Sequence, residues 1–213
     1  MIYRDRADAG ESLAKALARW GGKKPLVAAI PRGAVPIGKI IAEWLGGELD
    51  VVLTRKLHAP GNPEFAIGAV DENGWTYLAN HASQAGASRQ YVEREVAAEL
   101  ETIRRRRAAY TPDRAPIDAA GRIVIVVDDG LATGATMIAA LHAMRARAPQ
   151  WLICAVPVGT REAVGKVQAY ADEVVCLETP SSFYAVGQFY GSFPQVSDEE
   201  VIASLRSVAN TPA

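Results

Sequence analysis

The chain has 213 residues, of which 49% are hydrophobic and 22% charged, with 23 basic and 24 acidic side chains. This length suits one α/β domain over residues 1–213, and the near-neutral charge gives no reason to expect nucleic acid as a partner. Because no apolar run approaches the ~20 residues of a membrane-spanning helix and the N-terminus has no hydrophobic targeting segment, we expect a cytoplasmic protein without a membrane partner.

Helix and strand patterns alternate through the first quarter of the chain. The spacing of apolar residues predicts helices over 8–20 and 36–45, and each range is followed by a Gly-Gly pair that would end the helix. Short apolar runs predict strands at 26–30 and 49–54.

The next segment is less regular. Residues 55–64 include four consecutive turn-forming residues and predict a mobile loop. Residues 65–70 and 75–78 predict the two strands of a β-hairpin. A long helix is predicted over 88–110, with the arginine run 104–107 as a solvated helix end.

Strands and helices alternate again in the second half. We expect strands at 124–127, 151–157 and 173–177, and the predicted helices cover 136–146, 161–171 and 197–208. This alternation predicts an α/β fold with a mainly parallel, twisted sheet flanked by helices. Both cysteines, Cys154 and Cys176, fall in apolar strand-like runs, so we expect free, buried thiols.

The segment 124–136 contains the chain's most informative motif. A β-branched strand ends at the adjacent carboxylates Asp128 and Asp129, and a Gly/Ala/Thr loop then opens a helix. Backbone N–H groups at a helix N-terminus suit a phosphate, and carboxylates suit the hydroxyls of a sugar. Because ligands bind at the carboxyl ends of parallel strands, Arg32 and Arg55 should lie near this motif.

This stretch resembles the phosphoribosyl-pyrophosphate (PRPP) motif of the type I phosphoribosyltransferases. The resemblance implies that fold, with a small hood, and a cofactor, Mg²⁺. It implies that Asp128 and Asp129 bind the ribose hydroxyls and hold Mg²⁺ through water. The 5′-phosphate would lie in the loop formed by Ala132, Thr133, Gly134, Ala135 and Thr136. Pyrophosphate would bind at Arg32, Gly33 and Ala34, with a cis peptide expected at Arg32–Gly33 or Gly33–Ala34.

The same resemblance assigns the reaction and its remaining residues. The family transfers the phosphoribosyl group of PRPP to a nitrogenous base and releases pyrophosphate, whose charge Arg55 and Lys56 would neutralise. Residues 55–64 would form the flexible catalytic loop. Ala132 occupies the position of an aspartate in hypoxanthine and guanine enzymes, which favours an adenine-like purine and makes Glu64 the candidate general acid/base.

Along almost the whole chain, the sequence is most similar to stand-alone bacterial phosphoribosyltransferases of undefined substrate. The hood that selects the base could be formed by 65–78 or by 179–193. Four aromatic residues of the second segment could stack on a base, pack onto the sheet or form a homodimer interface; they are Phe183, Tyr184, Phe189 and Tyr190. The three histidines have no expected role, and His58 has no expected partner.

Two other functions fit the same residues. The chain could bind PRPP or a nucleotide without catalysis and regulate a partner, or it could hydrolyse PRPP or a nucleotide with water in place of the base. Nucleotide triphosphatases and dinucleotide enzymes are disfavoured, since neither of their glycine-rich motifs occurs in the sequence.

Overall fold

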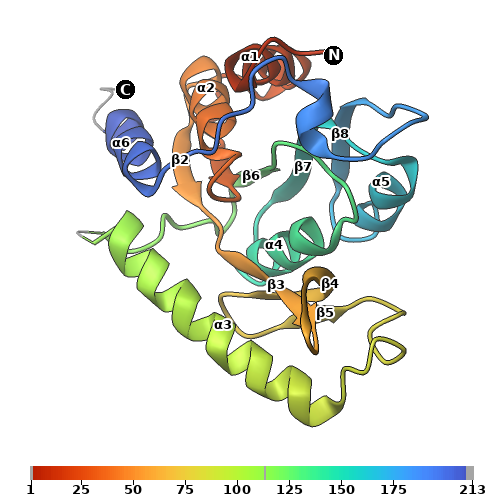
Figure 1. Ribbon diagram of the computed structural model, residues 1–213. Helices are drawn as coiled ribbons and strands as arrows, with labels where there is room; N and C mark the ends of the chain where they lie inside the picture. The colour runs from red at the N-terminus through yellow and green to blue at the C-terminus, as the bar shows by residue number, and fades with distance from the viewer. Residues whose placement is uncertain (1, 113, 210–213) are drawn as a thin grey trace.

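A five-stranded parallel sheet forms the centre of the computed structural model, which describes residues 2–112 and 114–209. The strand order is β2-β1-β6-β7-β8 (Figure 1). The strands are β1 (Leu26–Ala29), β2 (Glu48–Val51), β6 (Ile123–Val127), β7 (Trp151–Val158) and β8 (Glu173–Glu178). The sequence predicted all five because each is an apolar run of strand length; the single domain over 1–213 stays a prediction, since Met1, Asp113 and 210–213 lie outside the described residues.

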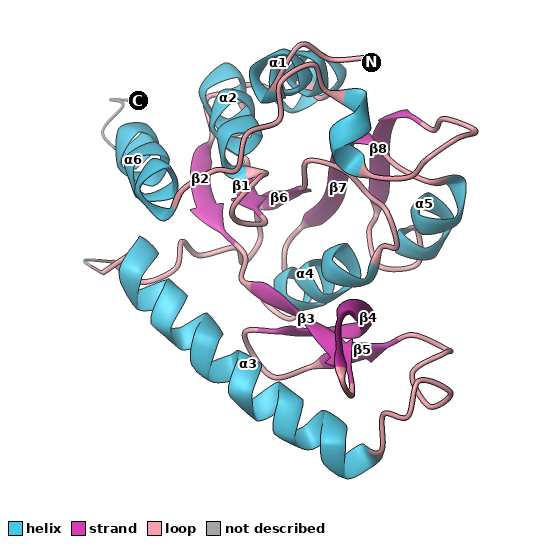
Figure 2. Cartoon of the chain, in the orientation of Figure 1, coloured by secondary structure: helices cyan, strands magenta, loops and turns pink. Residues whose placement is uncertain are grey.

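Helices cover both faces of this sheet. On one face pack α1 (Arg6–Ala16), α2 (Val35–Leu45) and α6 (Asp198–Ala209), and on the other α4 (Ala135–Arg145) and α5 (Arg161–Val167) (Figure 2). Successive strand residues supply alternate faces: Val27 and Ile125 contact the first layer, and Leu26 and Val124 the second. Because both faces are buried, these strands read as continuous apolar runs.

A second, antiparallel sheet lies between α4 and the long helix α3 (Arg89–Tyr110) (Figure 1). Its strands are β3 (Thr54–Ala59), β4 (Asn62–Asp71) and β5 (Thr76–Leu78). The structure confirms the hairpin predicted for 65–70 and 75–78. It also confirms α3, whose N-cap Ser88 accepts a hydrogen bond from the backbone N–H of Tyr91 at 3.2 Å.

The prediction of a loop over 55–64 was wrong in its secondary structure. Ala59 pairs with Asn62, so the turn needs only Pro60 and Gly61, and Gly61 has the positive φ of 71° that favours glycine. Pro63 is tolerated because this end of β4 pairs with β3 alone, which leaves one edge without a ladder. The turn-forming residues therefore mark a hairpin tip.

The prediction that the arginine run 104–107 forms a solvated helix end was only partly correct. Arg104 is exposed, whereas Arg107 lies on the inner side of the helix with Ile103 and Tyr110, one turn away in each direction. Arg107 donates to the Val51 carbonyl at 2.9 Å and forms ion pairs with Asp50 and Glu72. It therefore joins α3 to the end of β2.

The tail after β8 returns across the sheet. A short 3₁₀ helix, η2 (Val186–Phe189), precedes a bridge between Tyr190 and Tyr3, and α6 follows. Both cysteines are free as predicted, but only Cys154 is fully buried. A second 3₁₀ segment, η1 (Ala18–Trp20), follows α1. Among the described helices none is long and apolar enough to cross a membrane.

Candidate functional site at the carboxyl edge of the sheet

Segments that follow β1, β6 and β8 of the central sheet, together with β3 of the small sheet, meet in one cavity of about 280 Å³. The turn after β1 contributes Pro31 and Gly33, β3 contributes Lys56, and Val186 comes from the tail. The motif after β6 supplies most of the remaining wall. Its lining residues are Asp128, Asp129, Gly130, Leu131, Ala132, Thr133, Gly134 and Thr136. The structure therefore brings together most of the residues that the sequence singled out.

Asp128 and Asp129 form a close pair at the end of β6. The Asp129 N–H donates to Oδ1 of Asp128 at 2.8 Å, and the Asp128 N–H donates to the Ala155 carbonyl at 3.3 Å. Burial raises the pKa of the Asp128 carboxyl well above its usual range, and the negative charge of Asp129 raises it further. Burial also raises the pKa of Asp129, and the Arg6 guanidinium opposes that shift. Both carboxyls therefore hold a proton more readily than free carboxyls do, and a cation or hydrogen-bond donor bound in the cavity would favour their charged form.

Two carbonyl groups of the loop after the acidic pair are held by the segment that follows β7. Thr160, which follows β7, donates its N–H to the Leu131 carbonyl at 2.9 Å and its Oγ1 to the Ala132 carbonyl at 3.0 Å. Gly134 adopts a φ of 86°, and no side chain caps the helix α4 that begins at the next residue. The first N–H groups of α4 therefore lack a capping acceptor, which is the arrangement that binds phosphate.

The turn after β1 approaches the acidic pair closely. A Cβ on Gly33 would lie 2.0 Å from Oδ2 of Asp129, so only glycine fits there. The cis peptide is Pro31–Arg32, so the prediction of Arg32–Gly33 or Gly33–Ala34 was wrong by one or two bonds. Ala34 is buried in the core, and Arg32 points to a neighbouring cavity of about 320 Å³, near Asp198.

The structure separates Arg55 from Lys56. Lys56 lines the cavity, whereas Arg55 donates through Nε to Oε2 of Glu99 on α3 at 2.6 Å. Both residues belong to β3, where neighbouring side chains point to opposite faces. Only Lys56 of this pair therefore faces the acidic residues.

Glu64 is not brought into the cavity. It is exposed near the hairpin tip, and its N–H donates to Oδ1 of Asn62 at 3.1 Å. Residues of the 65–78 hairpin instead line a second cavity of about 470 Å³, which shares Ala132 and Thr133 with the first. The segment 179–193 contributes Val186 to the first cavity.

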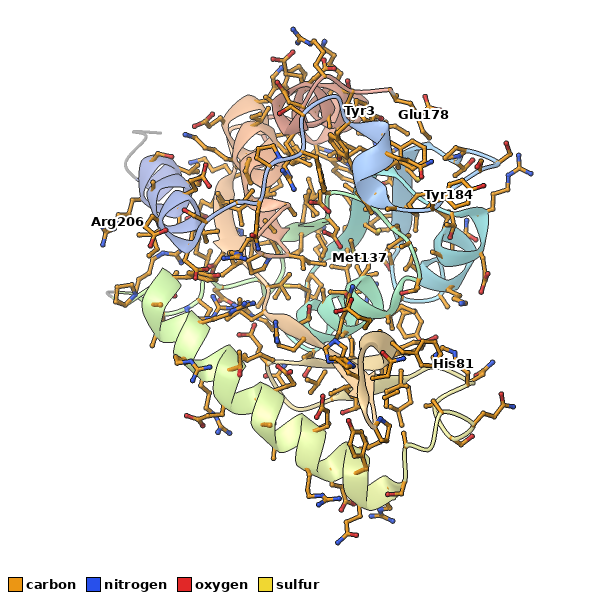
Figure 3. The ribbon with its side chains drawn as sticks, viewed as in Figure 1. Tyr3, His81, Met137, Glu178, Tyr184 and Arg206 are labelled. Atoms are coloured by element: carbon orange, nitrogen blue, oxygen red, sulfur yellow. The ribbon has the colours of Figure 1, made fainter. Side chains whose placement is uncertain are left out.

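Three of the four aromatic residues of the tail pack against the protein. Phe189 and Tyr190 are buried, and Phe183 contacts Phe189 with 5.0 Å between ring centroids. Tyr184 is 90% exposed and extends from the tail (Figure 3). Packing is therefore the role of three of them, and Tyr184 is the one with a free face.

The histidines are better connected than the sequence predicted. Nδ1 of His58, for which we expected no partner, lies 3.7 Å from Oε1 of Glu95. His142 stacks on Trp75 with centroids 3.8 Å apart, and its Nδ1 lies 3.1 Å from Oδ2 of the buried Asp71. These contacts join the small sheet to α3 and α4.

Sequence reasoning missed the residues that surround Asp129. Arg6 on α1 donates to its Oδ2 from Nη2 at 3.2 Å and from Nε at 3.4 Å, and Tyr190 donates to its backbone carbonyl at 2.6 Å. These partners lie 123 and 61 residues away in the chain, and no local pattern marks them. An arginine in the first turn of a helix carries no such signal by itself.

A parallel sheet with a turn, paired acids and an uncapped helix N-terminus at its carboxyl edge belongs to the class of α/β folds that bind ligands at this edge, and the helix N-terminus suits an anion. The phosphoribosyl transferase domain family matches residues 1–192, and the chain belongs to this family of enzymes. Two Mycobacterium tuberculosis proteins, provisionally named phosphoribosyl transferases, are each 43% identical over 208 residues. The match covers 96% of this chain but 46% of theirs, so the chain spans about half the length of these relatives.

Solved structures agree with this fold. The crystal structure of TT1426 from Thermus thermophilus is 47% identical, with a TM-score of 0.82, and the match covers 98% of this chain and 99% of that one. A Neisseria gonorrhoeae protein solved with bound ppGpp has a TM-score of 0.54 at 15% identity, covering 97% and 94% of the two chains. The second likeness concerns the fold alone.

Proposed function

We propose that this chain transfers the phosphoribosyl group of PRPP to a nitrogenous base with the help of Mg²⁺ and releases pyrophosphate. One observation carries the proposal: Asp128, Asp129, Lys56 and the uncapped first turn of α4 all line the same cavity. Acids for a sugar, amides for one phosphate and a cation for another are the groups that PRPP requires.

The site has one group for each part of PRPP. The 5′-phosphate would accept hydrogen bonds from the amides of 132–136 and from the hydroxyls of Thr133 and Thr136. The ribose hydroxyls would donate to Asp128 and Asp129. Pyrophosphate would lie between the Gly33 turn and Lys56, because both line this cavity. Arg32 would have to turn from the neighbouring cavity to reach it.

The acidic pair also fits a magnesium ion held through water. Oδ1 of Asp128 and Oδ2 of Asp129 have donors on other residues, while the second oxygen of each has no hydrogen-bond partner on another residue within 2–112 and 114–209. Mg²⁺ prefers such oxygens and keeps several waters when it binds phosphates. When bound, it would neutralise charge on the pyrophosphate and orient it.

In the proposed reaction a ring nitrogen of the base forms a bond to C1′ as the bond from C1′ to pyrophosphate breaks. The electron pair of the broken bond leaves with pyrophosphate, whose charge Lys56 would stabilise, and the N–H proton of the base passes to solvent water. The residues of the cavity hold the reactants in line and limit the access of water.

Two observations bear on which base accepts the phosphoribosyl group. Ala132 at the position described above favours an adenine-like purine, and Tyr184 offers an exposed ring for stacking. Glu64 would need a rearrangement of the hairpin tip to reach the cavity, so its role as general acid/base receives no support from its position.

The direct test incubates the chain with PRPP, Mg²⁺ and a panel of purine and pyrimidine bases and follows pyrophosphate release. Release that depends on one base supports the transferase. Binding of PRPP without release for any base would favour the regulator, and release without a base would favour the hydrolase.

The neighbouring cations of β3 give a matched comparison. We expect Lys56→Met to weaken pyrophosphate binding roughly tenfold, since a hydrogen bond to a charged group contributes about 1.5–3 kcal/mol. Arg55→Met removes an equal charge but should leave pyrophosphate binding unchanged, because Arg55 pairs with Glu99. Titration of both variants with inorganic pyrophosphate and Mg²⁺ measures the difference, and equal losses would show that Lys56 has no special position.

A further inference from the structure

A single arginine, Arg6, connects the acidic pair to the tail and to the turn after β1. The Arg6 side chain is 10% exposed and lies at the start of α1. Besides its two bonds to Asp129, its Nη1 donates to the Pro194 carbonyl at 2.7 Å, and its guanidinium carbon lies 3.7 Å from the centroid of the Phe193 ring. A buried charge with this many partners has a fixed position.

The two bonds from Arg6 to Asp129 reach the same oxygen. Nε and Nη2 both donate to Oδ2, and Oδ1 accepts no hydrogen bond from any other described residue. A bidentate arginine would occupy both carboxylate oxygens. The geometry here fixes the rotation of the carboxylate and leaves one of its oxygens available.

The fixed oxygen also borders the turn after β1. A Cβ on Gly33 would lie 2.0 Å from Oδ2 of Asp129 and 3.3 Å from Nη2 of Arg6. On the other side, Tyr190 donates to the Asp129 carbonyl at 2.6 Å. The pyrophosphate turn, the acidic pair and the tail therefore meet at Arg6.

We propose that Arg6 is a positioning residue for PRPP: it holds Oδ2 of Asp129 so that Oδ1 is presented to a ribose hydroxyl. The inference rests on the proposed ribose-binding role of Asp129. It adds a residue from α1, outside every segment that the motif identifies, and predicts that Arg6 acts on PRPP only through Asp129.

A double-mutant cycle tests this dependence. PRPP affinity with Mg²⁺ is measured by equilibrium dialysis for Arg6→Met, Arg6→Lys, Asp129→Asn and the Arg6→Met/Asp129→Asn pair. Arg4→Met is the matched control, because the Arg4 side chain is exposed and, within the described part of the chain, pairs with Asp8 alone. We expect Arg6→Met to weaken binding roughly tenfold, Arg6→Lys to restore part of the loss, and Arg4→Met to have no effect.

In the Asp129→Asn background, Arg6→Met should cause no further loss. Additive losses, or wild-type affinity in Arg6→Met, would overturn the positioning role. If Arg6→Met does not fold, the same cycle with Arg6→Lys decides the question. An unchanged PRPP affinity in Asp129→Asn alone would instead contradict the proposed ribose site, so the two failures are distinguishable.

Discussion

Replacing both Asp128 and Asp129 with asparagine is expected to reduce PRPP affinity more than any other change at the site. The two carboxylates would each accept a charge-assisted hydrogen bond from ribose, and each such bond contributes about 1.5–3 kcal/mol. The double variant should therefore bind PRPP at least a hundredfold more weakly, since about 1.4 kcal/mol corresponds to a tenfold change. Equilibrium dialysis with labelled PRPP measures the loss.

The single variant Asp128→Asn should remain folded and become more stable at neutral pH, because it leaves the buried ion pair of Arg6 and Asp129 intact. A carboxyl whose pKa is raised by burial favours folding while it is protonated, and that contribution is lost as the pH rises through the raised pKa. Asparagine has no charge to bury, and its carbonyl can still accept the N–H of residue 129. Urea unfolding at pH 7 and at acidic pH checks this, because the stability advantage should shrink as the pH falls. Full PRPP affinity in the double variant would refute the ribose assignment.

Asp50→Ala is expected to cause the largest loss of stability. Asp50 is 2% exposed, and its carboxylate lies between Arg107 and Arg114 at 3.3–3.4 Å. It also accepts the backbone N–H groups of Val51 and Ile117, both at 2.8 Å. Removing one partner of a buried ion pair costs about 3–5 kcal/mol, and the partial exposure of both arginines favours the lower end, about 3 kcal/mol.

The measurement is the free energy of unfolding in urea, with Glu101→Ala as control. Glu101 also pairs with an arginine of α3, Arg104, but both side chains are exposed, so little change is expected. Because Arg107 joins α3 to β2, Asp50→Ala should also loosen the α3 C-terminus in hydrogen exchange. Equal stability of the two variants would mean that this network does not hold α3 in place.

The sequence predicted most of the central sheet because a strand buried on both faces leaves an unmistakable apolar run, as in Ile123–Val127. The motif after that strand was local in sequence, so its acids and the loop expected to bind phosphate could be located directly. Thr133 and Gly134 line the cavity beside the acids for this reason.

The remaining features depend on contacts between distant segments. The hairpin within residues 55–64 was missed because a cluster of turn-forming residues does not show that only Pro60 and Gly61 form the turn. Arg55 and Lys56 could not be distinguished without the strand's register. Arg6 was missed because its partner follows 123 residues later in the chain.

The central claim is that the carboxyl edge of this sheet binds a phosphorylated pentose, and equilibrium dialysis of the wild-type chain with labelled PRPP and Mg²⁺ tests it most directly. The structure leads us to expect saturable binding at one site per chain, competed by pyrophosphate together with ribose 5-phosphate. Absence of saturable binding for PRPP in the folded protein would contradict the claim.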